Sequence, residues 1–161
     1  MRKFFDSFKT WRSIRKYLEK QVCEETVGQL LKTGKDMLDS MGEKVLSFTV
    51  IRNKETIEEL NRVAKKDMTK KSDVNIISRL GKTNDFDIFY GAPTVIMVSV
   101  KKGTKRISEN CTDIILKIVE TAKSLGLATS WNSFIKYCNE IPLEVPENYT
   151  PYFAISIGYG N

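Results

Sequence analysis

Residues 92–100, APTVIMVSV, limit how this chain can fold more than any other segment. The run is almost continuously apolar, rich in β-branched side chains, and begins at a Gly-Ala-Pro turn. It is far shorter than the roughly 18 apolar residues that a membrane-spanning helix needs. A run of this length and composition is typical of a central strand that is covered on both faces. The chain therefore requires a sheet with other elements packed against each side.

Helical and strand-like patterns alternate along the rest of the chain. We predict helices over residues 3–10, 24–37, 54–67, 73–80 and 108–124, with Ser108 as the N-cap of the last and Gly126 as its stop. We predict strands over residues 46–52, 92–100, 127–131 and 151–160, and an irregular or extended segment over 12–17. The predicted class is α+β or mixed α/β, as a single domain over 1–161 with about four or five strands.

Composition excludes several kinds of catalytic site. The chain of 161 residues contains no histidine, which excludes Ser-His and Cys-His nucleophilic sites and histidine-based zinc sites. Cys23, Cys111 and Cys138 are too far apart for a metal-ligand motif or a disulfide framework. We therefore expect no metal and a reducing, cytoplasmic location. The N-terminus lacks the long apolar stretch of a secretory signal.

The net charge of +6 points only weakly to an anionic partner. Basic residues are spread along the chain and alternate with acidic ones, with no concentrated basic stripe carrying aromatic platforms. This pattern does not favour nucleic-acid binding. We expect no membrane partner either, because no apolar run is long enough to span a bilayer.

The segment TWRSIRKYLEKQV, residues 10–22, gathers several cations around a single hydroxyl. Ser13 and Arg15 are two residues apart, so in an extended segment their side chains point to the same side. A hydroxyl beside a guanidinium makes a good clamp for an anion, since arginine offers a fork of donors that matches phosphate. The alternative is a solvated charge run, and this segment alone favours that alternative.

Other segments, taken in order, change that interpretation. They are RSIRKYLEKQVCEETVGQLLKTGKD, FTVIRNKETIEELNRVAKK, DIFYGAPTVIMVS, AKSLGLATSWNSF and YTPYFAISIGYGN. Together they resemble the nitroreductase family of flavoproteins, whose phosphate-binding segment, Tyr-Gly-Ala-Pro strand and flavin-ring segment follow one another in the same order. The resemblance extends over most of the chain.

The resemblance implies an α+β sandwich with a central, mainly antiparallel sheet, and an intertwined homodimer with FMN at the subunit interface. Such proteins accept hydride from NADH or NADPH and reduce nitroaromatics, quinones or similar acceptors. The flavin carries the chemistry, so no catalytic side chain is expected, and a chain without histidine can still be an oxidoreductase. By resemblance, the cofactor-binding residues are Arg12, Ser13, Arg15, Ser40, Thr129, Ser130, Trp131 and Asn132.

Several positions depart from the family pattern. Trp11 stands where the family has the first arginine of its phosphate segment, and Gly42 and Lys44 stand where it has amides that contact the flavin. Ala128 and Ser133 stand where glycines often let the backbone approach the ring. The sequence also ends at Gly-Tyr-Gly-Asn, without the basic tail usual in the family. We therefore expect any FMN to be held weakly.

The helix expected over 108–124 carries polar residues at spacings of four, three and four. These residues, which we call the polar stripe, are Asp113, Lys117, Glu120 and Ser124. In the family the equivalent helix is mostly apolar and packs in the dimer, so we expect weaker self-association here. Asp113 and Lys117 are also spaced for an ion pair. The bland alternative is a surface helix in a fold that never dimerised.

Two functions from different classes stay open at this point. The first is a short nitroreductase-like enzyme that binds FMN and uses NAD(P)H. The second is a non-enzymatic protein, diverged or engineered, that keeps the fold without the flavin.

Overall fold

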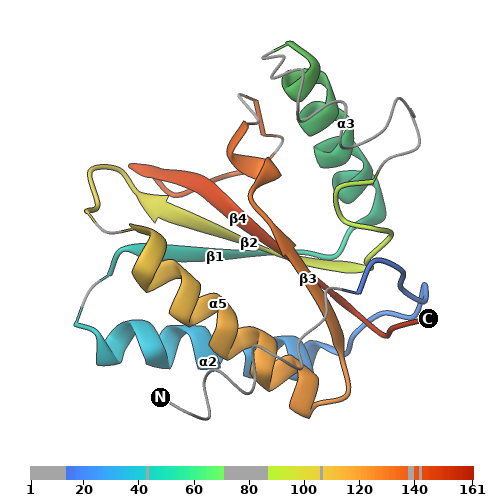
Figure 1. The fold of residues 1–161 in the computed structure, drawn as a ribbon, viewed down its shortest axis with the longest axis horizontal. Helices are drawn as coiled ribbons and strands as arrows, with labels where there is room; N and C mark the ends of the chain where they lie inside the picture. Colours follow the sequence, from blue (N-terminus) through green and yellow to red (C-terminus); the bar gives the residue numbers. More distant parts are fainter. Residues whose placement is uncertain (1–13, 43, 71–86, 106, 138–139, 142) are drawn as a thin grey trace.

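The computed structural model describes residues 14–42, 44–70, 87–105, 107–137, 140–141 and 143–161. The helices predicted over 3–10 and 73–80 lie outside the described residues. The described strands are β1 (Leu46–Ile51), β2 (Thr94–Lys101), β3 (Ala128–Asn132) and β4 (Tyr149–Gly158). They form one four-stranded sheet in the order β1-β2-β4-β3, with every neighbouring pair antiparallel (Figure 1).

Strand β2 is the interior strand that its apolar run predicted. Its residues are buried from Thr94 to Val100, and only the last residue, Lys101, is exposed. Ile96, Val98 and Val100 belong to one apolar cluster, whereas Val95 and Met97 belong to another. Because successive side chains of a strand point to opposite faces, a strand between two cores is apolar at nearly every position, and here only Thr94 and Ser99 are buried polar residues.

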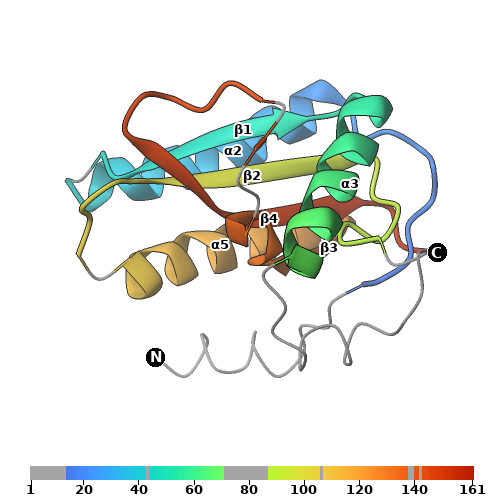
Figure 2. The same cartoon turned by 90° about the horizontal axis from the view of Figure 1, so that it is seen from above.

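Helices cover both faces of the sheet. Helices α2 (Glu24–Ser40) and α5 (Ile107–Ser124) lie beneath one face, and α3 (Lys54–Lys70) lies over the other (Figures 1 and 2). The short 3₁₀ helix η1 (Phe134–Tyr137) lies on the same side as α3 and adds Ile135 to that core. The first core contains Val27 and Leu30 from α2 and Ile114 and Ile118 from α5. This is the α+β sandwich that the family resemblance implies.

Helix boundaries differ from the prediction at several points. Helices α2 and α3 continue past their predicted ends, to Ser40 and Lys70. Helix α5 begins at Ile107, so the assignment of Ser108 as the N-cap is wrong, because an N-cap must precede the first helical residue. The predicted stop is confirmed, since Gly126 has φ of +76° and its N–H donates to the Lys123 carbonyl.

The polar stripe of α5 faces solvent, and the opposite face of the helix is buried. The ion pair on this face joins Lys117 Nζ to Glu120 Oε2 at 3.3 Å, in place of the predicted pair between Asp113 and Lys117. Both partners are more than half exposed, so the pair contributes little to stability. In a single chain, α5 is therefore a half-polar helix that meets water.

Candidate functional site

The segment of residues 14–23, which we call the strap, crosses the ends of β3 and β4 before it enters α2. The Ile14 N–H donates to the Thr129 carbonyl at 3.1 Å, and the Leu18 N–H donates to the Tyr159 carbonyl at 2.9 Å. Tyr17 also forms an isolated antiparallel bridge with Gly160. The strap has no helix of its own, so these backbone bonds to the sheet determine its path.

Tyr17 anchors the strap through its side chain. Its hydroxyl oxygen lies 2.9 Å from Ser130 Oγ and donates to the Ser156 carbonyl at 3.3 Å. Burial raises the pKa of Tyr17 to about 12; the bond with Ser130 acts in the opposite direction, and Tyr90 raises it further. Tyr17 therefore stays neutral at physiological pH and ties the strap to β3 and β4.

The close approach of Tyr17 to the sheet depends on a glycine. A Cβ on Gly158 would lie 2.9 Å from Tyr17 Cδ1 and 2.9 Å from Pro93 Cδ. Both rings therefore occupy space that any other residue at position 158 would fill. The strap, the start of β2 and the end of β4 meet at this point.

Cations of the strap lie over aromatic rings. The guanidinium carbon of Arg15 is 5.8 Å from the Tyr90 ring centroid, and Lys20 Nζ is 4.7 Å from that of Tyr159. Both cations are exposed. Cation–π contacts of this kind orient a charged side chain and leave its donors accessible. The strap can therefore present a guanidinium to an anion in solution.

Of the four residues that the family resemblance suggests on β3, Thr129 and Ser130 contact the strap, and Trp131 and Asn132 contact other segments. Thr129 and Ser130 are buried, and they contact the strap through the Thr129 carbonyl and the Ser130 hydroxyl. Trp131 packs edge-on against Phe153, with ring centroids 5.4 Å apart. Asn132 fixes the turn after β3, because its Nδ2 donates to the Ile88 carbonyl at 2.7 Å and its Oδ1 accepts the Phe134 N–H at 3.0 Å.

The other suggested cofactor-binding residues do not lie on β3. Arg12 and Ser13 lie outside the described residues. Ser40 lies at the C-terminal end of α2, where its Oγ donates to the Met37 carbonyl at 2.7 Å. The strap joins the other end of this helix, and 17 helical residues span about 25 Å. The structure thus brings Arg15 near Thr129 and Ser130, and it does not bring Ser40 to them within one chain.

Sequence reasoning gave too little weight to Tyr17 and Tyr90. Tyr17 belongs to the RSIRKY segment, so its position in a motif was the available signal. Tyr90 precedes the Gly-Ala-Pro turn, and only the fold shows that its ring lies under Arg15. Within the described residues, no group of acidic, cysteine or histidine side chains could hold a metal ion. None of the helices described has the length and apolar character needed to span a bilayer.

Comparison with known proteins agrees with this architecture. The model of the Nitroreductase family matches residues 8–159 of the chain. The chain is similar to a nitroreductase with bound FMN from Bacteroides fragilis NCTC 9343, with 26% identity and a TM-score of 0.80, over 98% of this chain and 88% of that one.

Two further solved structures share the fold. One is a nitroreductase with bound FMN from Desulfitobacterium hafniense DCB-2, at 18% identity, a TM-score of 0.80, and coverage of 100% of this chain and 90% of that one. The other is an FMN-dependent nitroreductase from Mycobacterium smegmatis in complex with NADPH, at 17% identity, a TM-score of 0.74, and coverage of 99% and 89%. With the family model matching nearly the whole chain, this protein belongs to the nitroreductase family.

Proposed function

We propose that this protein is a flavin-dependent oxidoreductase that binds FMN and uses NADH or NADPH to reduce nitroaromatic, quinone or similar acceptors. The observation that carries the proposal is the position of Arg15, an exposed guanidinium on a strap that is tied to the sheet beside β3. The similarity to an FMN-bound nitroreductase at 26% identity supports it.

The residues of the strap fit the phosphate of FMN. A guanidinium offers a planar fork of donors to phosphate, and Arg15 is always charged. The Tyr17 anchor and the backbone bonds of Ile14 and Leu18 hold the strap before any ligand arrives. Ordering a loop in advance removes part of the entropy cost of binding. By the family resemblance, Arg12 and Ser13 would add to this contact.

By the family resemblance, backbone groups of β3 from Thr129 to Asn132 would lie along the flavin ring, since the Ser130, Trp131 and Asn132 side chains already contact other residues of the chain. When bound, FMN supplies the hydride transfer between nicotinamide and acceptor. The chain's own residues bind the nucleotide, orient its ring against β3 and keep the phosphate at the strap. None of the described residues has to act as an acid or base for that role.

A second copy of the chain would complete the site. Ser40 is separated from the strap by the length of α2, about 25 Å, so Ser40 and Arg15 of one chain would not contact the same nucleotide. In a homodimer, one copy would supply Arg15 and the partner would supply Ser40. The exposed polar stripe of α5 favours a loosely held dimer over a tight one.

A second candidate, a flavin-free protein that keeps the fold, is favoured by two features, one in the turn after β3 and one just before β1. The Phe134 N–H already donates to Asn132 Oδ1, so this backbone donor is not available to a ligand. Lys44, an exposed cation, also stands where the family pattern has an amide. The first feature removes a backbone donor, and the second replaces a neutral amide with a cation that has no acceptor oxygen.

Titration of FMN with ligand-free protein, followed by flavin fluorescence, separates the two candidates. We expect micromolar binding by the parent, and weakening by about ten- to a hundredfold in Arg15→Ala, the effect of losing one charge-assisted contact of about 1.5–3 kcal/mol. Arg62→Ala is the matched control, because Arg62 is an exposed arginine on α3 that pairs with Glu59. Micromolar binding that Arg15→Ala leaves unchanged would contradict the assignment of Arg15. No binding by the parent would favour the flavin-free candidate.

A further inference from the structure

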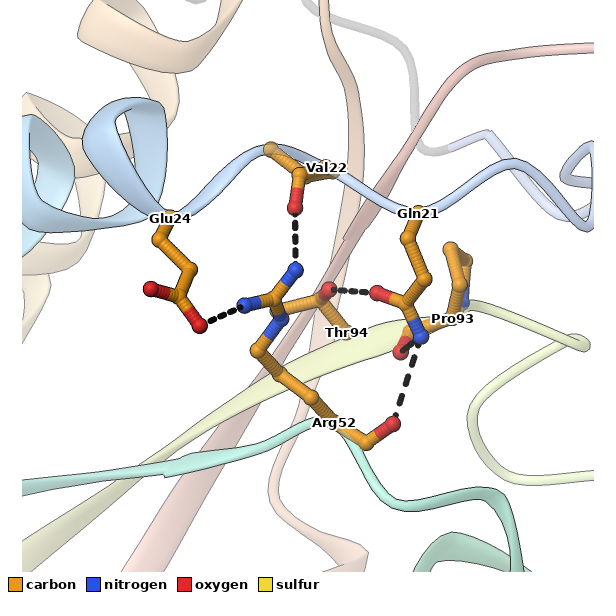
Figure 3. Close-up of polar contacts among 6 residues, drawn as sticks. All are labelled: Gln21, Val22, Glu24, Arg52, Pro93 and Thr94. Carbon is orange, nitrogen blue, oxygen red and sulfur yellow. Dashed lines mark hydrogen bonds and ion pairs between the residues drawn. The ribbon is translucent and has the colours of Figure 1, made fainter.

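A polar junction joins the strap to the ends of β1 and β2, and Gln21 is at its centre (Figure 3). Gln21 Nε2 donates to the Arg52 carbonyl at 3.2 Å and to the Pro93 carbonyl at 2.9 Å. Its Oε1 accepts the hydroxyl of Thr94 at 3.1 Å. Both ends of one side-chain amide are therefore bonded, and they connect three separate segments of the chain.

Arg52, which follows β1, contacts the strap through its guanidinium. Its Nη2 donates to the Val22 carbonyl at 2.5 Å, and its Nη1 lies 3.2 Å from Glu24 Oε1 (Figure 3). The Glu24 side chain is 91% exposed, so this ion pair is worth little. The bond to the Val22 carbonyl is charge-assisted and partly buried, so it is the stronger of the two.

The junction and the Tyr17 anchor hold the strap at two points, and Pro93 takes part in both. The Pro93 carbonyl accepts from Gln21, while the Pro93 ring packs with the Tyr17 ring around Gly158. Without the junction, the strap would be held only over residues 14–18, by the Tyr17 side chain and the backbone bonds to the sheet, and its second half would have no bond to β1 or β2. A strap held at both points has a single register, and Arg15 lies just before the first of them.

We infer that Gln21 and Arg52 are positioning residues, which hold the strap in the register where Arg15 meets the phosphate of a flavin nucleotide. The inference rests on the proposed function. The junction itself does not touch the ligand, and it acts through the strap. It therefore favours the phosphorylated flavin, FMN, over riboflavin, which has no phosphate for Arg15 to bind.

The ratio of FMN affinity to riboflavin affinity tests this role. In Gln21→Ala we expect the FMN dissociation constant to rise about fivefold or more, the equivalent of one hydrogen bond of about 1 kcal/mol, and the riboflavin constant to change less than about twofold. A merely structural loss would weaken both ligands alike. Gln29→Ala is the matched control, since Gln29 is an exposed glutamine of α2 whose side chain makes no hydrogen bond in the described part of the chain.

A second variant tests the junction more gently. Thr94→Val removes only the hydroxyl that donates to Gln21 Oε1 and keeps the shape of a fully buried side chain. We expect it to shift the FMN-to-riboflavin ratio in the same direction by a smaller factor. The inference would be overturned if Gln21→Ala and the parent both bind FMN and have the same ratio of FMN affinity to riboflavin affinity.

Hydrogen exchange of ligand-free protein separates this inference from the proposed function. The Leu18 N–H, bonded to the Tyr159 carbonyl, should exchange faster in Gln21→Ala than in the parent or in Gln29→Ala. Unchanged exchange at Leu18 would refute the anchoring. Faster exchange in a protein whose parent binds no FMN would support the anchoring and refute the proposed function, together with the phosphate role of the junction.

Discussion

Gly158→Ala is the sharpest test of how the strap meets the sheet. The added Cβ would lie 2.9 Å from both Tyr17 Cδ1 and Pro93 Cδ, closer than real Cβ contacts, so one of the two rings must move. Neither ring moves freely, because the Tyr17 hydroxyl is bonded to Ser130 and the Pro93 carbonyl to Gln21. Overpacking of this kind costs about 1–3 kcal/mol.

Part of that cost is offset, because alanine lowers the entropy of the unfolded chain by an amount worth about 0.4–1 kcal/mol. We therefore expect the free energy of unfolding to fall by about 1–2 kcal/mol. With an m-value of about 2 kcal/mol/M, the urea midpoint should fall by about 0.5–1 M. The measurement is urea unfolding of ligand-free protein at one fixed concentration, since ligand or self-association would shift the midpoint.

Gly28→Ala is the control for this prediction. Gly28 lies in α2, and a Cβ there would meet nothing within 4 Å. Alanine in a helix interior should raise the free energy of unfolding by about 0.5–1 kcal/mol. A Gly158→Ala variant that is as stable as the parent would refute the close packing of Tyr17 and Pro93 around this residue.

Further predictions concern pH, thiol reactivity and self-association. The pKa of Tyr17 is about 12 in the folded protein and near 10 in the unfolded chain, so the unfolded chain loses this proton first as the pH rises. The free energy of unfolding should therefore fall between pH 10 and pH 12, and it should fall less in Tyr17→Phe. Equal losses in the urea midpoints of the two proteins would contradict this. Cys23 is exposed and its bond with Thr26 lowers its pKa, whereas Cys111 is buried and burial raises its pKa to about 11. Cys23 should therefore be alkylated at least about tenfold faster than Cys111. Peptide mapping that shows equal labelling of the two cysteines would refute this. Sedimentation at micromolar concentration should show monomer or a loosely held dimer, and a tight dimer that buries the polar stripe would show that the interpretation of α5 is wrong.

The layered fold could be predicted from the sequence because its signals are local. The almost continuously apolar run at residues 94–100 is typical of a strand with a core on each face, and β2 is that strand. Helix α2 repeats its buried residues with helical spacing, as Val27, Leu30, Gly34 and Leu38. The glycine that ends α5, Gly126, adopts the positive φ that its residue type allows. Periodicity and residue type carry this information because neighbours on one face are close in sequence.

Details within these elements were less predictable, since they depend on small energy differences. Spacing alone allowed Lys117 to pair with Asp113 or with Glu120, and the structure has the pair with Glu120. Exposed ion pairs differ by only fractions of a kcal/mol, so sequence spacing cannot choose between them. The start of α5 at Ile107 moved Ser108 inside the helix for a similar reason, because helix ends are set by marginal local preferences.

The candidate site depends on contacts that no local pattern encodes. Tyr17 meets Ser130 across 113 residues of sequence, and Gln21 meets Arg52 and Pro93 across 31 and 72 residues. Charge and spacing around Arg15 left a phosphate clamp and a solvated charge run both open, and the family resemblance of other segments favoured the clamp. Only the strand order β1-β2-β4-β3 brings the ends of those strands together beneath one strap. The sequence by itself determines which donors and acceptors the chain contains. Because strand pairing is non-local, only the tertiary structure determines which of them form hydrogen bonds with one another.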